Sequence, residues 1–124
     1  MDQIQNSLEK IIRIPSNYRK GNSSPVTLLK ESGYVELHEQ INEPEIEEIL
    51  KLYPQLINEW LLWSENKRSS PRWHFDKFED DTYAVAYSIE GKEIEFNTKD
   101  EFKACAAFIM HEIEDTRIFI VNHP

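Results

Sequence analysis

Tyr83-Ala84-Val85-Ala86-Tyr87-Ser88-Ile89 is the stretch that decides the fold of this chain. Its large side chains alternate with small ones, and a period of two is typical of a β-strand with one buried face. The same period recurs before this stretch, at Trp73 and Phe75, and after it, at Ile94 and Phe96. The sequence therefore predicts three consecutive strands that form an antiparallel meander.

Short polar segments separate the three predicted strands, and a helix follows them. Glu79-Asp80-Asp81 and Glu90-Gly91 contain residues that are common in tight turns. Thr98-Lys99-Asp100-Glu101 has the pattern of a capping box, which predicts a helix from Asp100 to Thr116 that packs against the sheet. The segment from Arg117 to Val121 is β-prone, so the sequence leaves open a fourth strand after this helix.

The first 66 residues have helical spacing instead. Pro15 is expected to end the first helix, a polar loop to follow from Ser16 to Ser24, and Gly33 to end the second helix. The segment from Tyr34 to Gln40 fits either a strand or a helix. Four helices are predicted, with starts at Asp2, Ser24, Asn42 and Pro54.

Together these patterns predict an α+β fold in a single domain of residues 1–124. A helical half covers about residues 1–66, and a half made of the sheet and its helix covers about residues 73–121. We expect a sheet of three or four antiparallel strands packed against the C-terminal helix. The 124 residues of the chain, with a mass of 14.7 kDa, match the usual size of one domain.

The composition narrows the possible functions. A formal net charge of −9 and a pI near 4.9 argue against binding to nucleic acid or to an anionic membrane, because both would repel the chain. The single cysteine excludes an internal disulfide, no apolar run is long enough to span a bilayer, and the first residues lack the pattern of a signal peptide. We therefore expect a soluble cytoplasmic protein.

The acidic residues fall into two blocks. Residues 31–66 contain nine glutamates and one lysine, whereas residues 78–116 contain eleven acidic residues and three lysines. A basic segment from Asn66 to Arg72 lies between them. Acidic faces are often only solvated, but two blocks divided by a basic segment also fit an interaction surface.

Residue types that carry chemistry do not form a catalytic or metal-binding pattern here. Cys105 lies on the apolar stripe of its helix, so we expect a buried, inert thiol rather than a nucleophile with His111 or His74 as its base. His74 and Asp76 could share a metal ion, as could His111 and Asp115, but each pair supplies only two ligands. The sequence predicts no catalysis, no cofactor and no metal.

The segment from Trp73 to Ile113 resembles a known class of proteins. Its acidic turn, its Tyr83-x-Val85-x-Tyr87 strand and its helix with Glu101-Phe102-x-Ala104-Cys105 are similar to the C-terminal halves of small bacterial immunity proteins. Those proteins protect cells from polymorphic or contact-dependent toxins. The resemblance implies a cytoplasmic protein that binds and neutralises a cognate toxin, often a cationic nuclease.

A basic toxin would be expected to meet the acidic blocks. No basic residue lies between Glu31 and Lys51, so we expect the field of the first block to be uncompensated, and the turn acids are exposed by geometry. The predicted partner-binding residues are Glu36, Glu39, Glu43, Glu45, Glu47, Glu48, Glu79, Asp80 and Asp81.

Two other functions fit the same sequence. The first is an acidic mimic of nucleic acid that inhibits a DNA-binding protein. The second is a small enzyme or ligand-binding domain that uses His74 and Asp76 with the neighbouring Trp73. A toxin gene immediately upstream of the gene for this protein would favour the immunity function over both.

Overall fold

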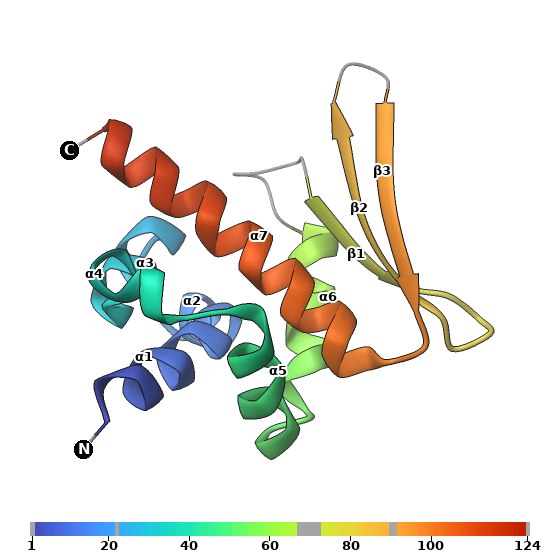
Figure 1. Ribbon diagram of the computed structural model, residues 1–124, viewed down its shortest axis with the longest axis horizontal. Coiled ribbons are helices and arrows are strands. Elements are labelled where there is room, and N and C mark those ends of the chain that lie inside the picture. The colour runs from blue at the N-terminus through green and yellow to red at the C-terminus, as the bar shows by residue number, and fades with distance from the viewer. Residues whose placement is uncertain (1, 22, 67–72, 90–91, 124) are drawn as a thin grey trace.

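Seven α-helices and a three-stranded sheet form the part of the chain that the computed structural model describes, residues 2–21, 23–66, 73–89 and 92–123 (Figure 1). The helices are α1 (Gln3–Ile12), α2 (Ile14–Lys20), α3 (Pro25–Ser32), α4 (Tyr34–Leu37), α5 (Glu43–Leu52), α6 (Leu56–Asn66) and α7 (Glu101–Asn122), and a 3-10 helix covers His38–Gln40. The strands are β1 (Trp73–Lys77), β2 (Tyr83–Ile89) and β3 (Lys92–Thr98). The predicted α+β architecture is confirmed, with α7 running between the smaller helices and the sheet (Figure 1).

The sheet is the predicted antiparallel meander, in the order β1-β2-β3. Phe75 pairs with Val85, and Val85 pairs with Phe96, so these three side chains lie on one face. The predicted turn at Glu90-Gly91 lies outside the described residues, as does the basic segment after Asn66.

The inner face of the sheet packs against α7. Phe108 of α7 stacks on Phe75 with ring centroids 5.6 Å apart, and both side chains are at most 1% exposed. Trp60 of α6 meets Phe108 edge to face at 6.2 Å and donates its indole N–H to the carbonyl of Ile12 at 3.0 Å. One continuous core therefore joins the helical half to the sheet half.

Local signals set most helix ends as predicted. The side chains of Asp2 and Ser24 each accept a backbone N–H at the start of α1 and α3, and Gly33 ends α3 in the left-handed conformation with φ of 84°. Asn42 and Glu45 form a reciprocal capping box at α5. At α7 the predicted capping box is wrong, because Asp100 itself caps the N–H groups of Phe102 and Lys103.

The chain contains more helix than the sequence predicts. The expected loop from Ser16 to Ser24 is wrong in its first part, since Ile14–Lys20 forms α2 with Pro15 in its first turn, where proline needs no N–H partner. The β-prone tail from Arg117 to Val121 is the last part of α7 and not a strand. Helix α6 begins at Leu56, two residues after the predicted start at Pro54.

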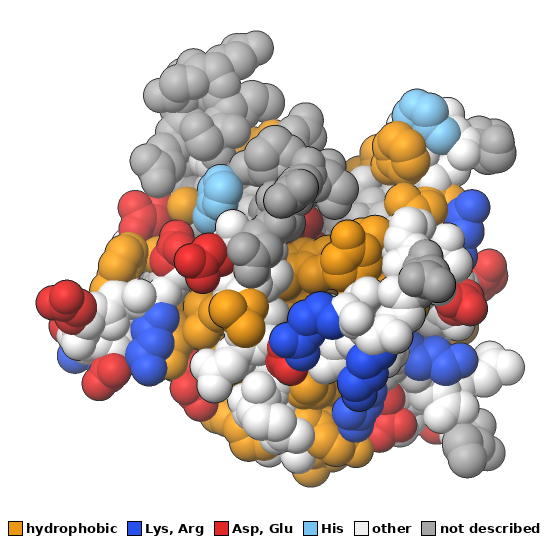
Figure 2. Space-filling view, turned by 180° about the vertical axis from the view of Figure 1, so that it is seen from behind, with side chains coloured by type: hydrophobic (Ala, Val, Ile, Leu, Met, Phe, Trp, Pro, Cys, Tyr) orange, Lys and Arg blue, Asp and Glu red, His pale blue; other side chains and the backbone are white. Residues whose placement is uncertain are grey.

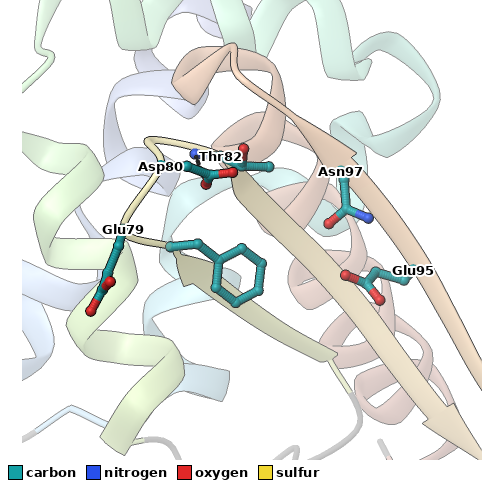
Figure 3. A pocket seen from close by; sticks show the side chains of 6 residues that line it. Glu79, Asp80, Thr82, Glu95 and Asn97 are labelled. Atoms are coloured by element: carbon teal, nitrogen blue, oxygen red, sulfur yellow. Dashed lines mark hydrogen bonds between the residues drawn. The ribbon is translucent and has the colours of Figure 1, made fainter.

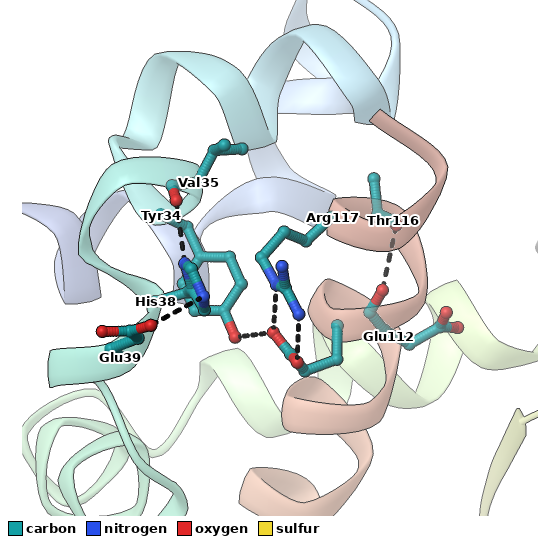
Figure 4. A network of polar contacts seen from close by, with 8 residues as sticks. Tyr34, Val35, His38, Glu39, Glu112, Thr116 and Arg117 are labelled. Carbon is teal, nitrogen blue, oxygen red and sulfur yellow. Dashed lines mark hydrogen bonds and ion pairs between the residues drawn. The ribbon is translucent and has the colours of Figure 1, made fainter. Parts of the chain in front are cut away.

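The ambiguous segment from Tyr34 to Gln40 is helical, and a polar network fastens it to α7 (Figure 4). The buried Tyr34 hydroxyl donates to the Glu114 carboxylate, which also accepts bonds from Arg117 Nε at 2.8 Å and from a terminal guanidinium nitrogen at 3.0 Å. One turn along, the imidazole Nδ1 of His38 lies 2.9 Å from the carbonyl of Val35. The bonds to Glu114 tie Tyr34 to α7 just before the β-prone tail, which continues the same helix.

The Glu114 network predicts a pH-dependent contribution to stability. The Arg117 guanidinium and the Tyr34 hydroxyl hold the pKa of Glu114 below its ordinary value of 4.5. As the pH falls through 4.5 and then through the lowered pKa of the folded carboxyl, the unfolded carboxyl takes up its proton before the folded one, and this contribution to stability is lost. In thermal melts over this range, Glu114→Gln should lose less stability than wild type. Glu36→Gln removes an exposed carboxylate and should behave as wild type.

The core predicts a protected thiol. Cys105 is 0% exposed, and its burial raises the pKa of the thiol well above the ordinary value. A thiol reagent should therefore label the native protein at least about a thousandfold more slowly than the denatured chain, because reaction requires opening of the core. Labelling at equal rates in the two states would contradict this placement.

Candidate partner-binding surface

The turn between β1 and β2 holds its acidic residues in a defined shape. The N–H of Phe78 donates to the carbonyl of Thr82 at 2.8 Å, and the N–H of Asp81 donates to the carbonyl of Phe78 at 3.1 Å. Hydrogen bonds from the side chain and the N–H of Thr82 lower the pKa of Asp80, so this carboxylate stays ionised. Glu79, Asp80 and Asp81 are all exposed, as the sequence predicts.

Glu79 and Asp80 border an open hollow of about 610 Å³ at the tip of the sheet (Figure 3). Thr82 lines it from the turn side, and two residues of β3, Glu95 and Asn97, line it from the opposite side. Phe78 is the apolar member of the lining and is 47% exposed. The described part of the chain places no cation within ion-pair distance of Glu79 or Glu95.

The hollow lies on the outer face of the sheet. Because Phe75, Val85 and Phe96 face α7, alternation places the residues beside them on the opposite side. On β2, this face carries the small side chains of Ala84 and Ala86. Among the strand residues whose exposure the structure describes, the exposed polar ones on this face are His74, Asp76, Glu95 and Asn97.

The α5 glutamates of the first acidic block interact mainly with groups of the same helix and its cap. The Glu45 carboxylate accepts the N–H of Asn42 at 3.2 Å as part of the cap. Lys51 folds back along the helix, with its ammonium 3.1 Å from Glu48 and 3.7 Å from Glu47. The expectation of an uncompensated field is therefore wrong for Glu47 and Glu48, because i,i+3 and i,i+4 neighbours meet on a helix.

The structure does not bring the two acidic blocks together in one hollow. Glu43 lines a separate groove with Phe96, on the inner side of the sheet. Burial raises the pKa of Glu43, and the nearby charge of Glu47 raises it further. Glu36 and Glu39 are exposed on α4 and the 3-10 helix. Glu79, Asp80 and Glu95 are the acids that line the hollow with Phe78, and no member of the first block lines it.

The inner groove has a volume of about 260 Å³ and runs between the sheet and α7. The imidazole of His111 stacks on the indole of Trp73, with centroids 3.6 Å apart and an interplanar angle of 2°. Burial lowers the pKa of His111, and Asp115 partly offsets this effect. The groove is lined by Glu43, Trp73, Val85, Phe96, Lys103, Ala107 and His111.

The residues considered for metal binding lie apart. His74 and Asp76 point outward from β1, whereas His111 lies against Trp73 on the other face. Among the described residues, no group of three or more His, Cys, Asp or Glu side chains could hold a metal ion.

Four members of the hollow, Phe78, Thr82, Glu95 and Asn97, were not among the predicted site residues. The sequence contains the signal for Glu95. The period of two in β3 places its side chain on the face opposite to that of Phe96, next to Ala86 of β2. No comparable signal exists for Phe78, since its place depends on the bend of the turn.

Comparisons of the chain with protein-family models, with curated protein sequences and with solved structures gave no match. None of the described helices combines the length and the apolar character that a bilayer crossing requires. The hollow at the turn between β1 and β2 and its charged lining are therefore the basis for proposing a function.

The stacked imidazole gives a prediction for the groove. An NMR titration should place the pKa of His111 below 6.5, because protonation would charge a ring that Trp73 shields from water. Trp73→Ala should move this pKa back toward 6.5, and Asp115→Asn should lower it further by removing the attractive charge. A pKa of His111 above 6.5 in the wild type would contradict the burial.

Proposed function

We propose that this chain binds a basic protein partner through the outer hollow, and that it acts as an immunity protein that neutralises a cognate basic toxin. The observation that carries the proposal is the hollow itself, where Glu79, Asp80 and Glu95 surround the exposed ring of Phe78. Exposed acids are common on proteins, but here they border a depression that also offers an apolar contact.

The hollow suits the side chain of an arginine or a lysine. The carboxylates of Glu79 and Glu95 attract the cationic head, and the ring of Phe78 offers its face to the same cation or to the aliphatic stem. Bidentate bonds from a guanidinium to a carboxylate add directionality. A partner with a projecting basic side chain is therefore favoured over a neutral one.

Charge on the whole molecule supports the same partner. The net charge of −9 attracts a basic protein from a distance and speeds its association. Figure 2 shows that Lys and Arg side chains lie near the middle of one face and also beside Asp and Glu side chains toward its edges, so attraction at long range comes from the net charge rather than from separated areas of one sign.

We propose binding rather than catalysis for this chain. Its one thiol is buried in the core, His111 is stacked against Trp73, and His74 stands exposed on the outer face. No nucleophile and base among these residues lie together. A cytoplasmic location belongs to the same proposal, since an immunity protein acts where its toxin acts.

The test is a pull-down and a stopped-flow binding assay with the product of the neighbouring gene. The variant Glu79→Lys/Asp80→Asn/Glu95→Lys changes the charge of the hollow, while the amide oxygen that it introduces at position 80 can still accept the Thr82 N–H. We expect its association rate to fall at least about tenfold and its salt dependence to flatten, because screening acts on these charges.

A matched variant changes the net charge by the same amount on the helical side. Glu36→Lys/Glu39→Lys/Glu48→Gln alters exposed members of the first block and should bind within about threefold of wild type, because only the long-range field changes. The reverse order of effects would move the interface to α4 and α5. Phe78→Ala should raise the dissociation rate with little change in association.

A further inference from the structure

Strand β3 is the open edge of the sheet. Strand β1 has its outer side covered, since it contacts α6 and the N–H of Phe75 donates to the hydroxyl of Ser64 at 2.7 Å. In the sheet formed by the described strands, β3 pairs on one side only, with β2. An exposed edge is a template for another strand unless something blocks it.

The hydrogen-bond phase identifies which backbone groups of β3 point outward. Because the Phe75 N–H points to α6, the backbone of its partner Val85 points away from β1 and toward β3. The bond from the Phe78 N–H to the Thr82 carbonyl agrees with this alternation, because bonded and non-bonded pairs alternate along β1 and β2. Phe96, which pairs with Val85, therefore directs its N–H and C=O at β2.

Glu95 and Asn97 have the opposite phase. Their N–H and C=O groups point away from the sheet, while their side chains lie on the outer face beside the hollow. A strand added to β3 would pair with these backbone groups. Its side chains would alternate between the outer face, next to Glu95, and the inner face, next to Phe96.

The two faces offer such a strand different chemistry. On the outer face it meets Glu95 and the turn acids Glu79 and Asp80. On the inner face it meets Phe96, which is 40% exposed, at the groove that Lys103 also lines. Basic residues fit the first face and apolar residues fit the second.

We propose that β3 accepts an extended segment of the basic partner as a fourth antiparallel or parallel strand, in which basic and apolar residues alternate. The inference rests on the proposed function and specifies how the partner is held. A second copy of this chain is the less suitable occupant, because both copies carry a charge of −9 and both present Glu95 at the edge.

The test uses amide hydrogen exchange on the full chain, followed by NMR. The probe is the synthetic peptide acetyl-Lys-Val-Lys-Val-Lys-Val-Lys-amide. At about ten times its Kd, exchange at the amides of Glu95 and Asn97 should slow about tenfold, because exchange then needs the free form. The amide of Phe96 is the internal control, since β2 already protects it.

Two further reagents separate pairing from charge. A peptide of the same sequence with N-methyl groups along one edge keeps its charge but cannot pair fully, and it should give no protection at Glu95 or Asn97. In the protein, Asn97→Pro removes an N–H that β2 does not use and should weaken peptide binding at least about tenfold more than Asn97→Ala, which removes the same side chain but keeps the N–H. Circular dichroism and a thermal melt confirm that both variants fold.

The outcomes distinguish the two proposals. Equal binding of both peptides, with changes only at Glu79 and Asp80, would overturn strand addition and leave the acidic hollow in place. Absence of protection at Glu95 and Asn97 at saturating peptide would also overturn it. Dimerisation of the free chain in sedimentation, lost in Asn97→Pro, would make a second copy the occupant and overturn the basic segment.

Discussion

The contact of α7 with the inner face of the sheet is the interaction on which the rest of the structure depends. Phe108 stacks on Phe75 of β1 and touches Trp60 of α6, so α7 shares one aromatic cluster with two elements that lie earlier in the chain. Ala104 and Ala106 are also buried in α7 and are small enough to let neighbouring elements approach closely. Without this contact, the sheet would have three strands and no covered face, which is marginal in water.

Burial of one sheet face determines what the other face can do. The large residues of β1 and β2 are used in the core, and the outer face keeps small and polar side chains such as Ala86 and Asn97. A polar face with a hollow and an exposed aromatic residue at one end is accessible to another protein. The interaction surface is thus a consequence of how the core was filled.

The two acidic blocks have different physical roles in spite of similar charge. In α5, the Glu45 carboxylate takes part in the capping box with Asn42, and Glu47 and Glu48 pair with Lys51. Part of the charge of these acids is therefore used within the helix. At the sheet tip, Glu79 and Glu95 have no such cation among the described residues. The net charge of each block does not distinguish the paired glutamates of α5 from these two acids of the sheet tip. That distinction depends on which side chains lie three or four residues away on a helix, or across neighbouring strands.

The sequence by itself determined the features that depend on local chemistry. The meander follows from the alternation around Val85, and the helix starts at Asp2 and Ser24 follow from side chains that satisfy nearby N–H groups. Tertiary structure decided the rest. The segment from Tyr34 to Gln40 is fastened to α7 because Tyr34 donates to Glu114, 80 residues further along the chain, and the hollow exists because a turn brings Phe78 beside β3. Contacts between residues distant in the chain outweigh propensities of a few tenths of a kcal/mol per residue, and such contacts leave no local pattern in a single sequence.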